Sequence, residues 1–222
     1  MDFKLIKRVQ AYLLKGAIVF AILAGGTFTA RAETKLFSLK NIHQNIIDDY
    51  KNVKHISRHK LIAALQKEDK DNYLIFDVRE KDEYAVSHIK DAKLLPPSTW
   101  KSSFFRKFGD QIKGKQIIFY CSVGVRSSKM AKYLGQSLKE KGAKEIYNLE
   151  EGIFGWANQG APLYKSDEKS QKQKIRVKRE KLADKSHSQQ VEKALNQTTK
   201  VHPYNNHWGQ LINDETIRSY VP

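Results

Sequence analysis

Cysteine is nearly absent from this sequence, and its scarcity excludes a fold held together by disulfides. Cys121 is the only cysteine among 222 residues, so no internal disulfide can form. If the chain is exported, this single thiol faces an oxidising compartment, where an unpaired sulfur needs a reason to be present. We favour a reactive sulfur as that reason; the alternative is a small buried hydrophobic side chain.

The N-terminal region lacks an apolar run long enough to cross a membrane. Its run covers only Gly16–Ala24, whereas a spanning helix needs about 20 apolar residues. Ala30-Arg31-Ala32 follows with small residues around a cleavage position, and four basic residues precede the run: Lys4, Lys7, Arg8 and Lys15. This pattern is typical of a secretory signal peptide over residues 1–32, cleaved after Ala32. We therefore expect a periplasmic or secreted bacterial protein, attached to a membrane only if the signal stays uncleaved.

Acidic residues are too few to balance the basic ones. The chain has 40 Lys and Arg against 24 Asp and Glu, which gives a formal net charge of +16 at pH 7. The basic excess is spread along the chain, so it favours anionic substrates or anionic surfaces in general. Nucleic acid is not expected as a partner, because export would separate the chain from it.

One stretch combines an apolar strand, a short loop and a helix around the single cysteine. Four apolar residues, 117–120, lead into Cys121, and a helical pattern begins at Val125. In this arrangement the backbone N–H groups of the loop and of the first helical turn converge on one spot that favours an anion. The nearby charge of Arg126 also favours a thiolate. Cys121 is therefore the candidate catalytic residue, and the candidate substrate-binding residues are Ser122, Val123, Gly124, Val125, Arg126 and Ser127.

Strand patterns alternate with helix patterns from residue 52 to residue 164. Strands are expected at 53–56, 73–79, 92–95, 116–120 and 145–149, and helices after Ser38, after Ser57, after Ser98 or Thr99, and over 125–141. The spacing of apolar residues predicts that the last two helices bury Trp100, Phe104, Phe105 and Phe108, and Val125, Met130, Tyr133, Leu134 and Leu138. The alternation predicts an α/β fold, an open parallel sheet of about five strands with helices on both faces. A ligand site is expected at the carboxyl ends of its strands.

Three motifs in this order resemble the signatures of the rhodanese (thiosulfate sulfurtransferase) family, in single-domain form. They are D-V-R…E-Y…H-I from Asp77 to Ile89, C-x-x-G-x-R from Cys121 to Arg126, and E-G-I-F-G-W-x-x-x-G-x-P from Glu151 to Pro162. The resemblance covers residues 52–164. Ser87 stands where the family commonly has a glycine, Ser122 where many thiosulfate-active members have a basic residue, and Glu151 where a second glycine is common.

The resemblance implies a sulfurtransferase in which Cys121 carries a sulfane sulfur as a persulfide. The donor would be a small anion similar to thiosulfate or polysulfide, and the acceptor a thiol, cyanide or sulfite. Asp77, Arg79 and Glu83 would support the site by pairing acidic with basic side chains, and His88 would be structural. No metal and no organic cofactor is implied.

Two other functions stay open. Cysteine phosphatases, and arsenate reductases of similar chemistry, resemble the cysteine loop but place the arginine six positions after the cysteine. Here Arg126 follows Cys121 by five, which disfavours them. The other alternative is a non-catalytic binding module that uses the same scaffold to recruit a partner through its basic tail, residues 165–222.

The chain is expected to divide into four parts. Residues 1–32 form the signal, 33–51 a helical lead-in, 52–164 the rhodanese-like domain and 165–222 a basic extension that is either helical or disordered. The end of the extension regains apolar residues, so it either packs back onto the domain or binds a protein partner. His202 and His207 lie in it without a carboxylate or cysteine at metal-ligand spacing, and a metal site is not expected.

Overall fold

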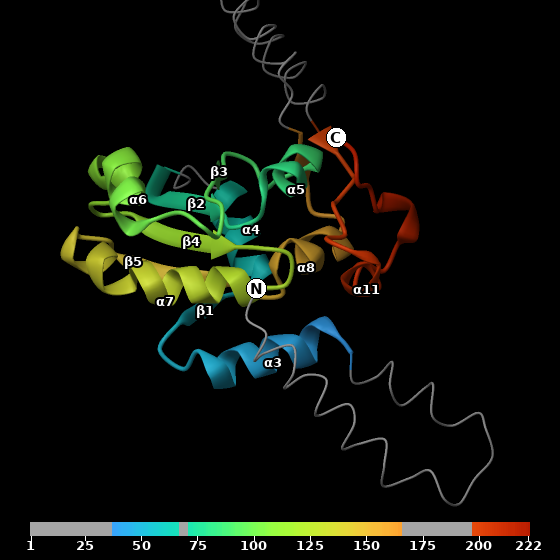
Figure 1. The fold of residues 1–222 in the computed structure, drawn as a ribbon, viewed down its shortest axis with the longest axis horizontal. Helices are drawn as coiled ribbons and strands as arrows, with labels where there is room; N and C mark the ends of the chain where they lie inside the picture. Colours follow the sequence, from blue (N-terminus) through green and yellow to red (C-terminus); the bar gives the residue numbers. More distant parts are fainter. Residues whose placement is uncertain (1–36, 67–70, 166–196) are drawn as a thin grey trace, which may run out of the picture.

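Five parallel strands form the central sheet of the computed structural model (Figure 1). The structure describes residues 37–66, 71–165 and 197–222. The strand order is β1-β5-β4-β2-β3, and every neighbouring pair is parallel. The strands are β1 (Lys54–Ile56), β2 (Tyr73–Asp77), β3 (Lys93–Leu94), β4 (Gln116–Tyr120) and β5 (Glu145–Leu149). The predicted open parallel sheet of about five strands is confirmed.

Helices cover both faces of this sheet, as predicted. They are α3 (Leu39–Asp49), α4 (Arg58–Gln66), α5 (Lys81–Val86), α6 (Lys101–Phe108), α7 (Val125–Glu140), α8 (Gly152–Asn158) and the short α11 (Asn206–Gly209), with 3-10 turns at Gly109–Gln111 and Glu215–Ile217. Residues of α3, α4 and α8 belong to one hydrophobic cluster. Residues of α6 and α7 belong to a second cluster.

The central strand β4 separates the two clusters. Ile118 and Tyr120 belong to the first cluster, and Ile117 and Phe119 belong to the second. Successive residues of β4 alternate between the two clusters because successive side chains of a strand point to opposite faces of the sheet. All four side chains are fully buried, which explains why this segment is apolar without interruption.

Local signals at the helix starts had mixed outcomes. Ser38 caps α3, because its Oγ accepts a hydrogen bond from the N–H of Asn41 at 3.2 Å. The prediction that Ser98 or Thr99 caps α6 was wrong. The capping position is Trp100, which makes no side-chain cap bond, and the Thr99 hydroxyl donates to the carbonyl of Pro96 at 2.7 Å.

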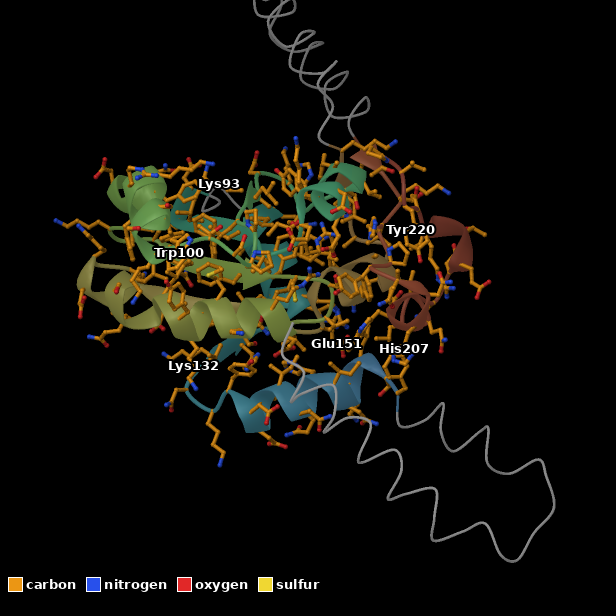
Figure 2. All side chains as sticks on the ribbon, viewed as in Figure 1. Lys93, Trp100, Lys132, Glu151, His207 and Tyr220 are labelled. Carbon is orange, nitrogen blue, oxygen red and sulfur yellow. The ribbon has the colours of Figure 1, made fainter. Side chains whose placement is uncertain are left out.

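Two aromatic side chains predicted to be buried lie at the surface instead. Trp100 is 76% exposed and Tyr133 is 45% exposed; Trp100 is labelled in Figure 2. Trp100 has extended backbone angles before the first turn of α6, so helical spacing does not govern its direction. The Tyr133 hydroxyl accepts the N–H of Lys101 at 3.2 Å. Phe104 and Phe108 are buried as expected.

The described end of the extension packs back onto the domain. Val201, Leu211 and Ile212 are buried in the cluster that also holds Ile118. The Asn158 amide at the end of α8 donates to the carbonyl of Leu211 at 2.8 Å. A two-stranded antiparallel sheet of β6 (Leu163–Tyr164) and β7 (Gln197–Thr198) makes a further contact. Residues 197–222 therefore share the hydrophobic core with the domain predicted for 52–164.

The predicted signal peptide, residues 1–32, and residues 166–196 of the extension lie outside the described residues. Within the described ranges, no helix is both long enough and apolar enough to span a bilayer.

Candidate active site

Cys121 directly follows β4, at the carboxyl edge of the sheet, and α7 begins four residues later. Gly124, the residue before α7, has a left-handed backbone with φ of 105°, which favours glycine. A Cβ at this position would also lie 3.1 Å from Nδ2 of Asn148 and 3.2 Å from Cδ1 of Ile46. The loop can therefore turn this tightly into the helix only with glycine at 124.

Two groups contact the Cys121 sulfur. The Gly124 N–H donates to Sγ at 3.2 Å, and the Ser127 hydroxyl oxygen lies 3.5 Å from Sγ. Cys121 is only 1% exposed. The sulfur therefore lies at the N-terminus of α7, in contact with one backbone donor and one hydroxyl, both from the residues predicted to line the site.

The start of α8 holds the cysteine loop through backbone hydrogen bonds. The carbonyl oxygens of Cys121 and Ser122 accept the N–H groups of Ile153 and Phe154, at 2.9 and 3.0 Å. A Cβ at Gly152 would lie 2.3 Å from the Cys121 carbonyl oxygen. Gly152 thus permits a contact between backbones that holds the cysteine loop on α8.

Arg126 forms a two-pronged ion pair with Glu83. Its Nη1 donates to Oε2 at 2.7 Å and its Nη2 to Oε1 at 2.8 Å. The Ser122 hydroxyl joins both partners, donating to Glu83 at 3.0 Å and accepting from Arg126 at 2.9 Å. The side chains of Ser122 and Arg126, two of the predicted substrate-binding residues, therefore both contact Glu83.

Glu83 and Arg126 each favour the charged form of the other, although both side chains are largely buried. Burial acts to raise the pKa of Glu83, but the hydrogen bonds and charge of Arg126, with a smaller contribution from Arg79, lower this pKa below its usual value. Burial acts to lower the pKa of Arg126, and Glu83 and the Cys121 sulfur raise it. The guanidinium and the carboxylate therefore both stay charged, and Arg126 also interacts electrostatically with the sulfur.

Asp77 and Arg79 form a second pair at the end of β2. Arg79 donates from Nε to Oδ1 at 2.9 Å and from Nη2 to Oδ2 at 2.6 Å, and both side chains are fully buried. Nη2 also donates to the carbonyl of Ser87 at 2.6 Å. Asp77, Arg79 and Glu83, predicted as one supporting network, are thus resolved into two pairs, because Glu83 is bound by Arg126.

The other predicted positions contribute less directly. Val123 is buried in the first hydrophobic cluster, and Val125 packs against the same cluster, so only the backbone N–H groups of these valines stay candidates for binding substrate. The His88 ring stacks on Tyr84 at 4.0 Å between centroids, consistent with the structural role inferred for it. Glu151 has φ of 58°, which explains the common glycine there, and its carboxylate pairs with Arg58.

Sequence reasoning missed Asn148, which joins the cysteine loop to β5. The Ser127 hydroxyl donates to Oδ1 of Asn148 at 2.6 Å, and Nδ2 of Asn148 lies 3.2 Å from Nδ1 of His55. Burial, together with the nearby His43, lowers the pKa of His55 to about 4, so the neutral ring can accept this bond. A buried asparagine at the carboxyl end of a strand was the available signal, because asparagine is depleted in strands.

Tyr204 is a second residue that the sequence did not reveal. Its ring centroid lies 5.0 Å from Cζ of Arg126, within the range of a cation–π contact. Tyr204 has φ of 64°, and its N–H donates to Nδ1 of the buried His202 at 3.0 Å. The β4 arrow points toward the side of the molecule that carries this C-terminal segment (Figure 1). Residues 197–222 thus reach the cysteine loop.

No group of three or more His, Cys, Asp or Glu that could hold a metal ion occurs within 37–66, 71–165 and 197–222. The ring of His207, labelled in Figure 2, packs against Phe37 in a tilted arrangement, with 4.4 Å between the ring centroids.

Comparison with known proteins gives a consistent family for the central part of the chain. The model of the rhodanese-like domain family matches residues 57–159. The thiosulfate sulfurtransferase GlpE of Coxiella burnetii is 33% identical over 107 residues, which cover 48% of this chain and 87% of that protein. A tRNA uridine(34) hydroxylase of Pectobacterium atrosepticum is 31% identical over 101 residues, 43% of this chain and 27% of that protein.

A rhodanese-like domain protein of Staphylococcus aureus is similar among solved structures. It is 27% identical with a TM-score of 0.41, and the match covers 52% of this chain and 100% of that one. This chain spans 27% and 52% of the length of the first two curated relatives. Residues 197–222, including Tyr204, lie outside the family match.

Proposed function

Because this chain belongs to the rhodanese-like family, we propose that it is a sulfurtransferase that carries sulfane sulfur as a persulfide on Cys121. The observation that supports this most is the position of the only cysteine. Cys121 directly follows the central strand, and its Sγ accepts the Gly124 N–H at 3.2 Å at the start of the 16-residue helix α7. This is a suitable place for a sulfur that becomes anionic.

In the first step the Cys121 thiolate attacks the sulfane sulfur of the donor. A new S–S bond forms, the bond of the donor to its sulfane sulfur breaks, and the electron pair leaves with sulfite or with a thiolate. The cysteine then ends in an outer sulfur that carries the negative charge or a proton. The Gly124 N–H, which donates to Sγ, stabilises this charge as it develops, and the Ser127 hydroxyl oxygen lies 3.5 Å from Sγ.

In the second step a thiophilic acceptor attacks the outer sulfur. Thiols, cyanide and sulfite have the required lone pair. The bond between the two sulfurs breaks, and Cys121 leaves as a thiolate, ready for another donor. One neutral sulfur atom is transferred in the whole cycle, so no metal, organic cofactor or external redox agent is needed.

The supporting residues have distinct roles in this proposal. Gly124 and Ser127 contact the sulfur, whereas Ser122, Arg126 and Glu83 hold the shape and charge of the loop. Asp77 and Arg79 fix the end of the neighbouring strand β2. We propose a periplasmic or secreted location, from the signal pattern over residues 1–32, and small sulfur-containing anions or thiols as the partners of the site.

A second candidate function is a non-catalytic binding module. The observation that favours it is that Cys121 is only 1% exposed, so the sulfur is largely covered in this conformation. A protein partner would then bind through residues 165–222. If a C121S variant restored every phenotype of a deletion strain, binding and not turnover would be the function.

Mass spectrometry of the intact protein tests the catalytic proposal. The protein is incubated with thiosulfate, with inorganic polysulfide and with an organic hydropersulfide, and a C121S variant is treated in the same way. We expect a gain of one sulfur atom on Cys121 and none in the variant. Absence of an adduct with all three donors would refute the proposed reaction.

A further inference from the structure

Arg126 is the one basic residue of the loop formed by residues 121–127, and its charge is balanced by Glu83. Three N–H groups of its guanidinium donate within the protein, two to Glu83 and one to Ser122. A guanidinium has five N–H groups. Most of its N–H groups thus already make hydrogen bonds within the protein before a sulfur donor binds. The pair of Arg126 and Glu83 carries no net charge.

The counter-charge is permanent at neutral pH. The Glu83 side chain is 2% exposed, and Arg126 lowers its pKa in spite of burial. Arg79, the other arginine close to Glu83, is bound to Asp77. The positive charge of each arginine is therefore already balanced by a carboxylate.

The C-terminal segment covers a face of the same guanidinium. The Tyr204 ring lies 5.0 Å from Cζ of Arg126, and only 24% of the Arg126 side chain is exposed. Tyr204 adopts a left-handed backbone, φ 64°, which costs energy for a residue other than glycine. The buried His202 holds this conformation through the Tyr204 N–H. The Tyr204 ring therefore helps to hold the Arg126 guanidinium against Glu83. It also prevents other anions from contacting one face of this guanidinium.

Charge distinguishes the two classes of sulfane donor. With thiosulfate, the thiolate attacks the sulfane sulfur and sulfite dianion leaves, so two negative charges must enter the site beside the thiolate. With an organic hydropersulfide, R–S–SH, the thiolate attacks the outer sulfur, giving Cys121–S–SH and the thiolate R–S⁻. The neutral donor brings no charge and its anion brings one. A loop whose only cation is neutralised favours the second class.

We propose that Glu83 and Tyr204 are specificity-determining residues that make this site select sulfane donors carrying at most one negative charge over dianionic thiosulfate. This inference rests on the proposed persulfide chemistry at Cys121. It assigns a role in that chemistry to residues 197–222, which the family match does not include.

The test measures rate constants for sulfur loading of Cys121 in the full chain. The two probes are thiosulfate and 2-hydroxyethyl hydropersulfide, followed by mass spectrometry at two ionic strengths. Glu83→Gln removes the counter-charge but keeps a hydrogen-bond acceptor, and Tyr204→Leu uncovers the guanidinium. The matched controls are Glu145→Gln, which breaks the ion pair between this β5 residue and Lys54 on β1, and Tyr133→Leu, which removes a ring 5.1 Å from the Lys101 ammonium.

Wild-type protein should load sulfur faster from the hydropersulfide than from thiosulfate. In Glu83→Gln the ratio of the thiosulfate to the hydropersulfide rate constant should rise about tenfold, because one full charge near the sulfur is unmasked. Its thiosulfate rate should also fall more steeply with salt than that of the wild type. Tyr204→Leu should raise the ratio by about two- to threefold, since it removes a contact of less than a full charge. Neither control should change the ratio.

An unchanged ratio in folded Glu83→Gln would overturn the inference. If that variant fails to fold, as judged by thermal melting, Tyr204→Leu decides in the same way. A wild-type protein that loads from thiosulfate faster than from the hydropersulfide would also overturn it. No adduct from either donor in the wild type would instead refute the proposed function and, with it, this inference.

Discussion

Two arginine–carboxylate pairs lie beside the cysteine loop, and they have similar hydrogen bonds but different surroundings. Asp77 and Arg79 are two residues apart, and both are fully buried at the end of β2. Glu83 and Arg126 are 43 residues apart, and Arg126 is still partly exposed. The first pair therefore fixes the fold near the site, whereas the second joins α5, the cysteine loop and the C-terminal segment. The two pairs differ in how deeply they are buried and in which segments they connect, and not in the geometry of their hydrogen bonds. These differences separate a structural pair from a pair that affects the reactivity of the cysteine.

The largest effect should come from breaking the fully buried pair. Arg79→Ala leaves the Asp77 carboxylate buried without its partner, and we expect a loss of about 3–5 kcal/mol in the free energy of unfolding. Chemical denaturation of wild type and variant measures this loss. A variant with an unchanged denaturation midpoint would show that the pair does not hold the fold.

A smaller loss of stability and a clear loss of rate should follow from breaking the second pair. Arg126→Ala leaves Glu83 unpaired, but water can reach the vacated space, so we expect about 1–3 kcal/mol. Sulfur loading should slow, because Arg126 interacts electrostatically with the Cys121 sulfur and shapes the loop. Denaturation and loading rates measured on the same samples check both effects. If stability fell by as much as in Arg79→Ala while loading stayed at the wild-type rate, the distinction between the two pairs would fail.

The second pair should also give stability a specific dependence on pH. Arg126 lowers the pKa of Glu83 in the folded protein, below an unfolded value of about 4.3. The pair's contribution is therefore complete above that value and is lost as the pH falls through the folded pKa. The difference in unfolding free energy between wild type and Glu83→Gln should be constant near neutral pH and shrink below about pH 4. A difference that stayed constant down to pH 3 would contradict the assignment.

The smallest effect should come from the hydroxyl contact that belongs to neither pair. Ser127→Ala removes the group 3.5 Å from Sγ and also the bond to Asn148. Losing the bond to Asn148, worth about 1 kcal/mol, should loosen the start of α7 beside Sγ and make loading up to about fivefold slower. Loading rates for Ser127→Ala and for Ser127→Thr, which keeps a hydroxyl, measure this. Equal rates for the alanine variant and the wild type would remove Ser127 from the site.

Most of the fold, the family and the place of Cys121 at the carboxyl end of a central strand could be predicted from the sequence. The alternation of strands and helices, the buried character of β4 and the three motifs are local patterns, and they predicted the parallel sheet and the family correctly. Patterns of this kind state which residues form an element. They do not state which distant side chain an element will face.

The pairing of Arg126 shows this limit. Its place five positions after Cys121 suggested a cation directed at the sulfur, but its partner Glu83 lies 43 residues earlier. Tyr204 reaches Arg126 from a segment without a family signature. Asn148 was hidden in a strand predicted only from its apolar neighbours. Trp100 was misplaced because helical spacing was applied to a residue that precedes the helix.

The most direct measurement follows a labelled sulfur through one turnover at Cys121. The chain is loaded with isotopically labelled sulfane sulfur, freed of donor, and mixed with cyanide or a thiol while protein and product are both analysed by mass spectrometry. The proposed mechanism predicts that the label leaves Cys121 at the same rate at which labelled product appears, and that C121S neither loads nor transfers it. A label that never enters Cys121, or that stays on it while product forms, would contradict a transferable persulfide at this cysteine.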